Sequence, residues 1–182
     1  DLPQAMKKPI GTTEVVLAPG QVCFATRPTR LRTLLGSCVA ITFWHPQRLI
    51  GGMCHFMLPG RLRNHQCLDG RYADEALELL LRHAQANGTQ ALDYQVKLFG
   101  GGEMFPNQRH HLPTQNVASQ NIRAALALAE RHHLHLTAQD LGSTRYRQIM
   151  YDLRNGNVWV RHQPMGTLQE DAYQKNQCAA GR

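Results

Sequence analysis

The sequence lacks the long apolar run that a membrane-spanning helix requires. No stretch approaches the roughly 18 consecutive apolar residues that are needed to cross a bilayer. Residues 1–10 also lack the basic start and apolar centre of a secretory signal peptide. We therefore expect a cytoplasmic protein that is not inserted directly into a membrane.

Cysteine is present but forms none of the usual paired patterns. The five cysteines, at positions 23, 38, 54, 67 and 178, are odd in number and include no C-x-x-C pair. This pattern argues against a zinc site and a disulfide framework, and free thiols agree with a reducing cytoplasm. The histidine-rich stretches at 109–111 and 131–135 have no carboxylate or thiolate at ligand spacing, so we expect no bound metal.

Acidic residues are fewer than basic ones. Lys and Arg number 20 against 13 Asp and Glu, which gives a formal charge of +7. Such an excess favours an acidic partner. The basic residues are scattered and no aromatic-plus-basic stripe accompanies them, so we expect no nucleic-acid binding. A membrane surface or an acidic protein surface remains as the acidic partner.

The apolar pattern predicts strands and helices that alternate along the chain. Strands are expected at 15–17, 22–24, 38–44, 49–56, 92–99, 134–138, 148–153 and 158–162, and amphipathic helices at 72–86 and 116–131. Asn116 is a plausible N-cap, and Asn155-Gly156 predicts a hairpin turn with positive φ at both residues. From 182 residues we expect one α/β domain at 1–162, a layered sandwich with a mixed sheet and two main helices, followed by a polar tail at 163–182.

Two neighbouring segments carry the strongest chemical signal. Residues 33–40 read T-L-L-G-S-C-V-A and residues 51–59 read G-G-M-C-H-F-M-L-P, so Cys38 opens one predicted strand and His55 closes the next. In an antiparallel pair those two ends are adjacent. A histidine that lowers the pKa of a neighbouring thiol makes a nucleophile for acyl groups. From the residues alone, a buried structural cysteine and a core histidine stay open as alternatives, while Cys54 is expected to face the opposite side of the strand.

These segments resemble the CheD family of chemoreceptor glutamine deamidases. That family has T-L-L-G-S-C-V-A followed by G-G-x-x-H-F-x-L-P. Further along, residues 97–102 are similar to its K-x-F-G-G segment, Asn116-Val117 to its R-N-V helix start, and Asp140–Gly142 with Arg147 to its D-x-G-G-x-x-G-R segment. The matching segments occur in the same order as in the family, over about residues 12–162.

The resemblance implies a hydrolase that converts glutamine side chains to glutamate on methyl-accepting chemotaxis receptors. Cys38 would be the nucleophile and His55 the general base, through a thioester and with no metal or organic cofactor. Thr33 is the nearest match to the hydroxyl residue that orients the imidazole. Some relatives carry that hydroxyl one position earlier, where this chain has Arg32.

Two glycine-containing segments are expected beside this pair. Gly36 and Ser37 would form a tight turn whose backbone N–H groups stabilise an oxyanion. A second segment would form a close-approach loop for the substrate or partner, and consists of Phe99, Gly100, Gly101 and Gly102.

The implied partners are proteins of the chemotaxis system. They are the helical cytoplasmic domains of chemoreceptors, whose acidic surfaces suit the charge of +7, and a CheC-like phosphatase. The same acyl chemistry would hydrolyse a glutamyl methyl ester, so a methylesterase side activity stays open. A binding module without activity and a toxin-like deamidase acting on a host protein are the other classes that remain.

Overall fold

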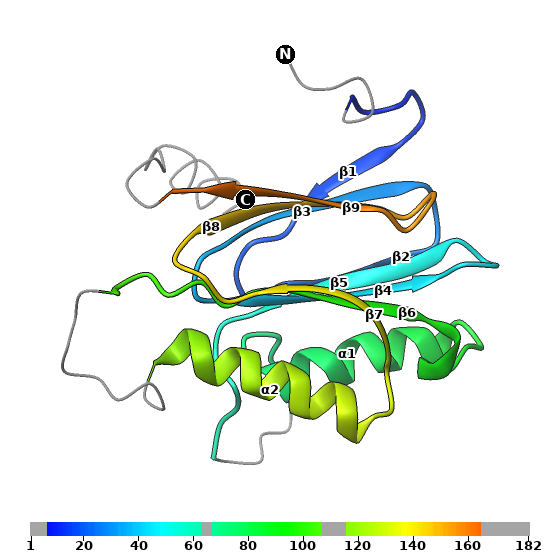
Figure 1. Cartoon of the computed structure of the whole chain (residues 1–182). Helices are drawn as coiled ribbons and strands as arrows, with labels where there is room; N and C mark the ends of the chain where they lie inside the picture. Colours follow the sequence, from blue (N-terminus) through cyan, green and yellow to red (C-terminus); the bar gives the residue numbers. More distant parts are fainter. Residues whose placement is uncertain (1–6, 63–66, 107–115, 165–182) are drawn as a thin grey trace.

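The computed structural model describes residues 7–62, 67–106 and 116–164, which form strands and helices in separate layers (Figure 1). The strands are β1 (Thr13–Val16), β2 (Val22–Ala25), β3 (Thr29–Leu35), β4 (Val39–His45), β5 (Ile50–Phe56), β6 (Gln95–Gly100), β7 (His135–Leu141), β8 (Tyr146–Asp152) and β9 (Val158–Gln163). The helices are α1 (Ala73–Ala86), the short 3-10 helix η2 (Ala91–Asp93) and α2 (Val117–Arg131).

Two sheets and one layer of helices are stacked on one another. A five-stranded sheet of order β2-β5-β4-β6-β7 is the middle layer, with the four-stranded sheet β1-β3-β8-β9 on one face and α1 and α2 on the other (Figure 1). Both sheets are mixed, since β1 pairs parallel with β3 and β6 pairs parallel with β7. The predicted α/β layered sandwich with two main helices is confirmed. The division of the strands between two sheets was not indicated by the sequence pattern.

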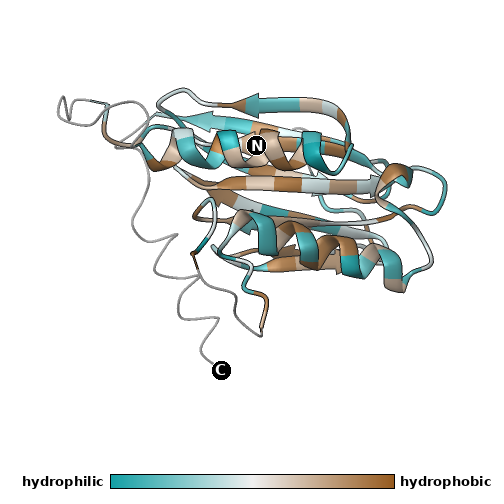
Figure 2. Ribbon diagram, turned by 90° about the horizontal axis from the view of Figure 1, so that it is seen from below, coloured by the Kyte–Doolittle hydropathy of each residue, from teal (hydrophilic) through white to brown (hydrophobic). Residues whose placement is uncertain are grey.

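Each interface between layers has its own hydrophobic core. Phe43, Leu77 and Leu80 belong to the core between the helices and the middle sheet, while Leu31 and Met53 belong to the core between the two sheets. Figure 2 looks onto the helical layer and shows hydrophilic and hydrophobic residues alternating along the helices. All seven residues of β5 are buried, because this strand is covered on both faces. A strand of that kind has a nearly continuous apolar sequence rather than an alternating one.

Strand β3 was not predicted from the sequence. Its sequence T-R-L-R-T-L-L contains two arginines, yet the side chain of Arg30 is only 1% exposed and its Nε lies 3.3 Å from Oδ2 of Asp152. The guanidinium of Arg30 also lies 5.8 Å from the ring centroid of Trp159. A buried ion pair at this point hides the apolar alternation by which a strand is recognised. β3 carries Thr33 and ends at Leu35, three residues before Cys38.

The last hairpin is confirmed, but its turn differs from the prediction. β8 and β9 pair antiparallel as expected. Only Gly156 in the turn has a positive φ, 75°, so the prediction of positive φ at Asn155 was wrong. A Cβ on Gly156 would lie 2.4 Å from the ring of Trp44, which explains why a glycine is needed there. Most of the expected tail, 165–182, lies outside the described residues.

The remaining predicted elements are present, but the strand predicted at 92–99 begins later, at Gln95, because Ala91–Asp93 form the 3-10 helix η2. Asn116 caps α2, since its Oδ1 accepts a hydrogen bond of 2.8 Å from the backbone N–H of Ala118. The predicted strands at 15–17 and 22–24 exist but belong to different sheets. Across the described ranges, no helix has the length and apolar character to cross a membrane.

Candidate active site

The hairpin of β4 and β5 places Cys38 and His55 on the same face of the middle sheet. In its register Ala40 is opposite His55 and Val39 is opposite Phe56. Side chains alternate along a strand, so Cys38 shares a face with Ala40 and is the diagonal neighbour of His55. That face looks toward the four-stranded sheet, where Cys38 packs against the core between the sheets. Cys54 packs instead in the core beneath the helices, as predicted.

Thr33 reaches His55 from the four-stranded sheet. Its Oγ1 lies 2.7 Å from Nδ1 of His55 and donates a hydrogen bond of 2.9 Å to the carbonyl of Leu17. A threonine hydroxyl has one proton, and here that proton goes to Leu17, so Oγ1 accepts from Nδ1–H. This fixes the tautomer of His55 with its lone pair on Nε2. The side chain of Arg32 is 46% exposed and pairs with Glu14, so Arg32 does not contact the imidazole.

The other ring nitrogen of His55, Nε2, is the second feature of this arrangement. Nε2 is buried and has no hydrogen-bond partner among the described residues. A buried polar atom of this kind costs free energy unless it is paired. The imidazole of His55 lies on the face of the middle sheet that also carries Cys38. The imidazole is held in place by Thr33 and by burial, since His55 is only 1% exposed.

Burial opposes charge on both Cys38 and His55. Desolvation raises the pKa of the Cys38 thiol from 9.0 to about 11 and lowers the pKa of the His55 imidazole from 6.5 to about 4. The expectation that His55 lowers the pKa of Cys38 is therefore wrong for this state. At neutral pH the Cys38 thiol and the His55 imidazole are therefore both uncharged.

The turn that precedes Cys38 presents free backbone donors. The carbonyls of Gly36, Ser37 and Cys38 accept hydrogen bonds from the N–H of Gly102 (2.9 Å), the side-chain amide of Asn121 (3.0 Å) and the N–H of Gly101 (2.9 Å). The N–H groups of Ser37 and Cys38 donate to no atom within the described ranges. Backbone donors held this way beside a nucleophile are suited to bind a developing oxyanion.

The glycine segment lies directly against Cys38, as predicted. Gly100 has a φ of 112°, and a Cβ there would lie 2.3 Å from the carbonyl oxygen of Cys38. Gly101 has a φ of 70°, and a Cβ there would lie 2.4 Å from Cγ1 of Ile122 in α2. Only glycine permits this close packing at a positive φ. Phe99 was expected on the same loop, but it belongs to β6, is 4% exposed and packs between the sheets.

Two residues near the site were not singled out as functional from the sequence. Asn121 of α2 is fully buried although it is polar. It lies on the same helix face as the buried residues Ala118, Ala125 and Leu128. A polar residue at an apolar position of an amphipathic helix is the sequence signal that could have identified it. Arg147 of β8 is 1% exposed, and its Nε lies 3.0 Å from Oδ1 of Asp140. In the sequence it stood out only as part of a family motif.

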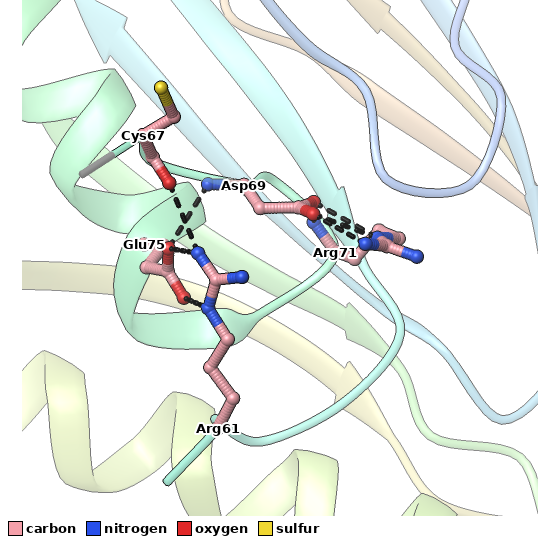
Figure 3. A network of polar contacts seen from close by, with 5 residues as sticks. All are labelled: Arg61, Cys67, Asp69, Arg71 and Glu75. Atoms are coloured by element: carbon pink, nitrogen blue, oxygen red, sulfur yellow. Dashed lines mark hydrogen bonds and ion pairs between the residues drawn. The ribbon is translucent and has the colours of Figure 1, made fainter. Parts of the chain in front are cut away.

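The chain that follows His55 is fixed by an ionic network at the start of α1 (Figure 3). Arg61 binds both carboxylate oxygens of Glu75 at 2.8 and 2.6 Å and the carbonyl of Cys67 at 3.0 Å. The backbone N–H of Asp69 donates to Glu75, and the Asp69 side chain binds Arg71. The cation–π contact of Arg61 with Tyr72, at 4.8 Å, adds to this. The network ties the segment after β5 to the first turn of α1.

The histidine-rich stretches lie away from the Cys38–His55 pair or outside the described residues. His132 is the C-cap of α2 and His133 follows it, which agrees with the prediction of a helix end. His110 and His111 lie outside the described residues. Across residues 7–62, 67–106 and 116–164, no group of three or more His, Cys, Asp or Glu side chains is placed to hold a metal ion.

Two kinds of comparison with known proteins lead to the same family. The family model described as CheD, chemotactic sensory transduction, matches residues 57–162. A "Probable chemoreceptor glutamine deamidase CheD" from Pseudomonas fluorescens is 87% identical over 177 residues, covering 97% of this chain and 100% of the relative. The protein of that name from Pseudomonas savastanoi is 71% identical with the same coverage. "CheD 1" from Chromobacterium violaceum is 41% identical over 157 residues, 86% of this chain and 81% of the relative.

The relatives are similar to this chain across the hairpin as well as the rest of the fold. The two Pseudomonas matches cover nearly all of the chain and therefore include the hairpin that carries Cys38 and His55. The family match and the pairwise identities lead to the same family as the motifs on that hairpin. The chain belongs to the CheD family.

Proposed function

We propose that this protein deamidates glutamine side chains on the cytoplasmic helical domains of chemoreceptors, with Cys38 as the nucleophile. The observation that carries the proposal is the state of His55, whose Nδ1 is bound to Thr33 while Nε2 is buried and free. An oriented base beside a thiol is the arrangement that acyl transfer requires. The names of the relatives supply the substrate class.

The first half-reaction forms a thioester and releases ammonia. As Sγ of Cys38 attacks the carboxamide carbon, its proton moves to Nε2 of His55. The carbonyl oxygen becomes an oxyanion, which the N–H groups of Ser37 and Cys38 bind. The tetrahedral intermediate then collapses: the C–N bond breaks, Nε2 gives its proton to the departing nitrogen, and ammonia leaves. His55 is again neutral, with the free lone pair that it had at the start.

The second half-reaction hydrolyses the thioester. A water molecule gives a proton to Nε2 of His55 and attacks the acyl carbon, forming a second oxyanion in the same place. When this intermediate collapses, the C–S bond breaks and the Cys38 sulfur takes the proton from His55. The product is a glutamic acid side chain, which releases its proton to the solvent to become glutamate, and the enzyme is restored. Thr33 acts throughout by holding Nδ1–H, so that only Nε2 exchanges protons.

The charge of the chain suits this substrate. A formal charge of +7 favours encounter with an acidic helical surface, chiefly through the rate of association. Each deamidation adds one negative charge to a receptor helix, which biases a two-state signalling equilibrium. A substrate in the cytoplasmic part of the receptor supports the proposal that the enzyme acts in the cytoplasm. The same chemistry accepts a glutamyl methyl ester, and a CheC-like phosphatase is the further partner that we propose.

The test follows the mass of a receptor cytoplasmic fragment incubated with the protein. We expect a gain of about 1 Da per site in helical peptides, because an amide becomes a carboxylate. In water enriched in oxygen-18, each new carboxylate should also carry one heavy oxygen from the hydrolytic water. Cys38→Ala should abolish both signals. Cys54→Ala is the matched control, because Cys54 adjoins His55 in sequence but packs on the opposite face.

Other results of this experiment would point to a different function or a different nucleophile. Binding of the fragment without a mass change in either protein would reject the deamidase and favour an adaptor. A loss of mass restricted to methylated peptides would assign a methylesterase instead. If Cys54→Ala and Cys38→Ala lost activity equally, Cys38 would not be the nucleophile.

A further inference from the structure

Asn121 is a buried polar residue that contacts the candidate site from the helical layer. It lies in α2 and has no exposed surface. Its side-chain Nδ2 donates two hydrogen bonds, of 3.0 Å to the carbonyl of Ser37 and of 2.9 Å to the carbonyl of Met57. Both protons of one amide group are therefore used to hold two separate backbone segments.

The two acceptors bracket the reactive pair. Ser37 immediately precedes Cys38 in the turn between β3 and β4, and Met57 lies two residues after His55, just beyond the end of β5. The strand ladder joins β4 and β5 only from Val39 and Phe56 onward. Cys38 lies outside that ladder, so its turn depends on other contacts for its position. One side chain of α2 supplies a direct link between this turn and the chain that leaves His55.

The cost of keeping Asn121 in this place indicates that the link matters. Its Oδ1 is buried and has no hydrogen-bond partner among the described residues. An unpaired buried acceptor is unfavourable, and a helix face packed on a sheet is more stable with an apolar residue. The neighbouring positions on this face, Ala118 and Ala125, are apolar and buried. Stability of α2 alone therefore gives no reason for an asparagine here.

Other contacts show that the first half of α2 supports the site as a whole. Gly101 packs against Ile122 so closely that a Cβ would lie 2.4 Å from Cγ1. The N–H of Gly101 in turn donates to the carbonyl of Cys38. α2 thus contacts the nucleophile's turn in two ways, through Asn121 at Ser37 and through Gly101 at Cys38.

We propose that Asn121 is a positioning residue, which fixes the Gly36–Cys38 turn relative to His55 so that the thiol and the imidazole nitrogen meet during catalysis. The residue touches neither reacting group and acts through the backbone of Ser37 and Met57. This inference rests on the proposed deamidase function, but one of its measurements does not need that function. A displacement of about 1 Å in a reacting group is enough to cost about 100-fold in rate.

The main test compares Asn121→Leu with Thr89→Val. Thr89 is also buried and donates to the carbonyl of Ala84 at 2.7 Å while pairing with Tyr94 at 2.6 Å, so each variant loses two buried hydrogen bonds. Thr89 lies beyond the C-terminal end of α1, and among the described residues its hydroxyl contacts Ala84 and Tyr94, not the site. We expect kcat to fall about 100-fold in Asn121→Leu with KM retained, and to stay at the wild-type value in Thr89→Val.

The second measurement is the pH dependence of Cys38 alkylation by iodoacetamide, read from the mass of its peptide. In Asn121→Leu the turn is released, so the thiol becomes better hydrated and the midpoint should move down, while Thr89→Val keeps the wild-type midpoint. A slower kcat with a more reactive thiol separates lost positioning from general destabilisation. If the wild type fails to deamidate the receptor fragment, the proposed function fails, and the alkylation midpoint alone decides the role of Asn121.

Asn121→Asp covers the case in which Asn121→Leu does not fold. The two side chains have nearly the same shape, but a carboxylate repels the two carbonyls, and its protonated form restores one donor. We expect the kcat of this variant, relative to the wild type, to rise as the pH is lowered. A ratio that does not depend on pH, or an Asn121→Leu variant that matches Thr89→Val in both kcat and alkylation midpoint, would overturn the proposal.

Discussion

Replacing Thr33 with valine removes one hydroxyl group and nearly preserves the shape of the side chain. The hydroxyl accepts from Nδ1–H of His55 at 2.7 Å and donates to the carbonyl of Leu17 at 2.9 Å. In Thr33→Val the imidazole therefore loses the group that fixes its tautomer and its orientation. Nothing in the described structure then prevents the proton from residing on Nε2, where it blocks the transfer from Cys38.

The expected magnitudes follow from these two contacts. Thr33→Val leaves one buried donor and one buried acceptor unpaired, at about 1–3 kcal/mol of unfolding free energy for each. General acid–base catalysis contributes about 10²–10⁴-fold to a rate, and loss of its orientation removes part of that factor. We expect kcat to fall about 10- to 100-fold, less than in His55→Ala, with KM retained. Thr33→Ser, which keeps the hydroxyl, should recover most of the loss.

The assay combines turnover, stability and the state of the imidazole. Ammonia release from a receptor fragment gives kcat, urea unfolding gives stability, and nitrogen-15 NMR of His55 reports which ring nitrogen carries the proton. Thr29→Val is the matched control, because Thr29 is a buried threonine of the same strand whose hydroxyl donates to the carbonyl of Arg27 at 2.8 Å. It should lose stability without change in kcat or in the His55 signal.

Two results would refute this reasoning. The first is a Thr33→Val variant that turns over as fast as Thr29→Val at equal folded fraction. The second is a wild-type NMR spectrum in which Nε2 of His55 already carries the proton. Either would mean that Thr33 does not set the tautomer.

Four further predictions concern pH and packing. With the pKa of Cys38 near 11 in place of 9.0, neutral solution should hold about 100-fold less thiolate than for an ordinary cysteine, so alkylation should be slow and rise into alkaline pH; a plateau at neutral pH would contradict this. The acid limb of kcat/KM should lie near pH 4, the pKa of His55, and a limb near 6.5 would argue against His55 as the base. Gly101→Ala should destabilise the protein by about 1–3 kcal/mol, because its Cβ would meet Ile122 and the backbone has a positive φ. Combined with Ile122→Ala, it should cost less than the sum of the two separate losses of unfolding free energy, and strict additivity would argue against the clash. Burial opposes ionisation of Asp152, but its contacts with Arg154 and Arg30 outweigh burial and lower its pKa below 3.8. The ionised carboxylate therefore stabilises the fold above about pH 4, and this stabilisation is lost as the pH falls. Asp152→Asn should lose less unfolding free energy in acid than the wild type, and an equal dependence of unfolding free energy on pH in both proteins would refute this.

The sequence determined those features that depend on local patterns. The apolar periodicity of α1, the cap at Asn116 and the hairpin that joins Cys38 to His55 are all set within short stretches of chain, and each was predicted. The opposite facing of Cys54 follows from strand alternation alone. The CheD motifs likewise lie on contiguous residues, so the family was visible before the fold.

Tertiary structure decided what brings distant segments together. Thr33 meets His55 only because the four-stranded sheet packs on the middle sheet, and the strand that carries it is hidden in the sequence by the buried arginine at position 30. The pKa of Cys38 depends on how deeply the packed layers cover the thiol, which reversed the expectation from pairing with a histidine. Asn121 is separated from Ser37 and Met57 by many residues, and no local pattern specifies which carbonyls its amide will reach. Local propensity sets each element, but burial and long-range hydrogen bonds are set only when the layers close on one another.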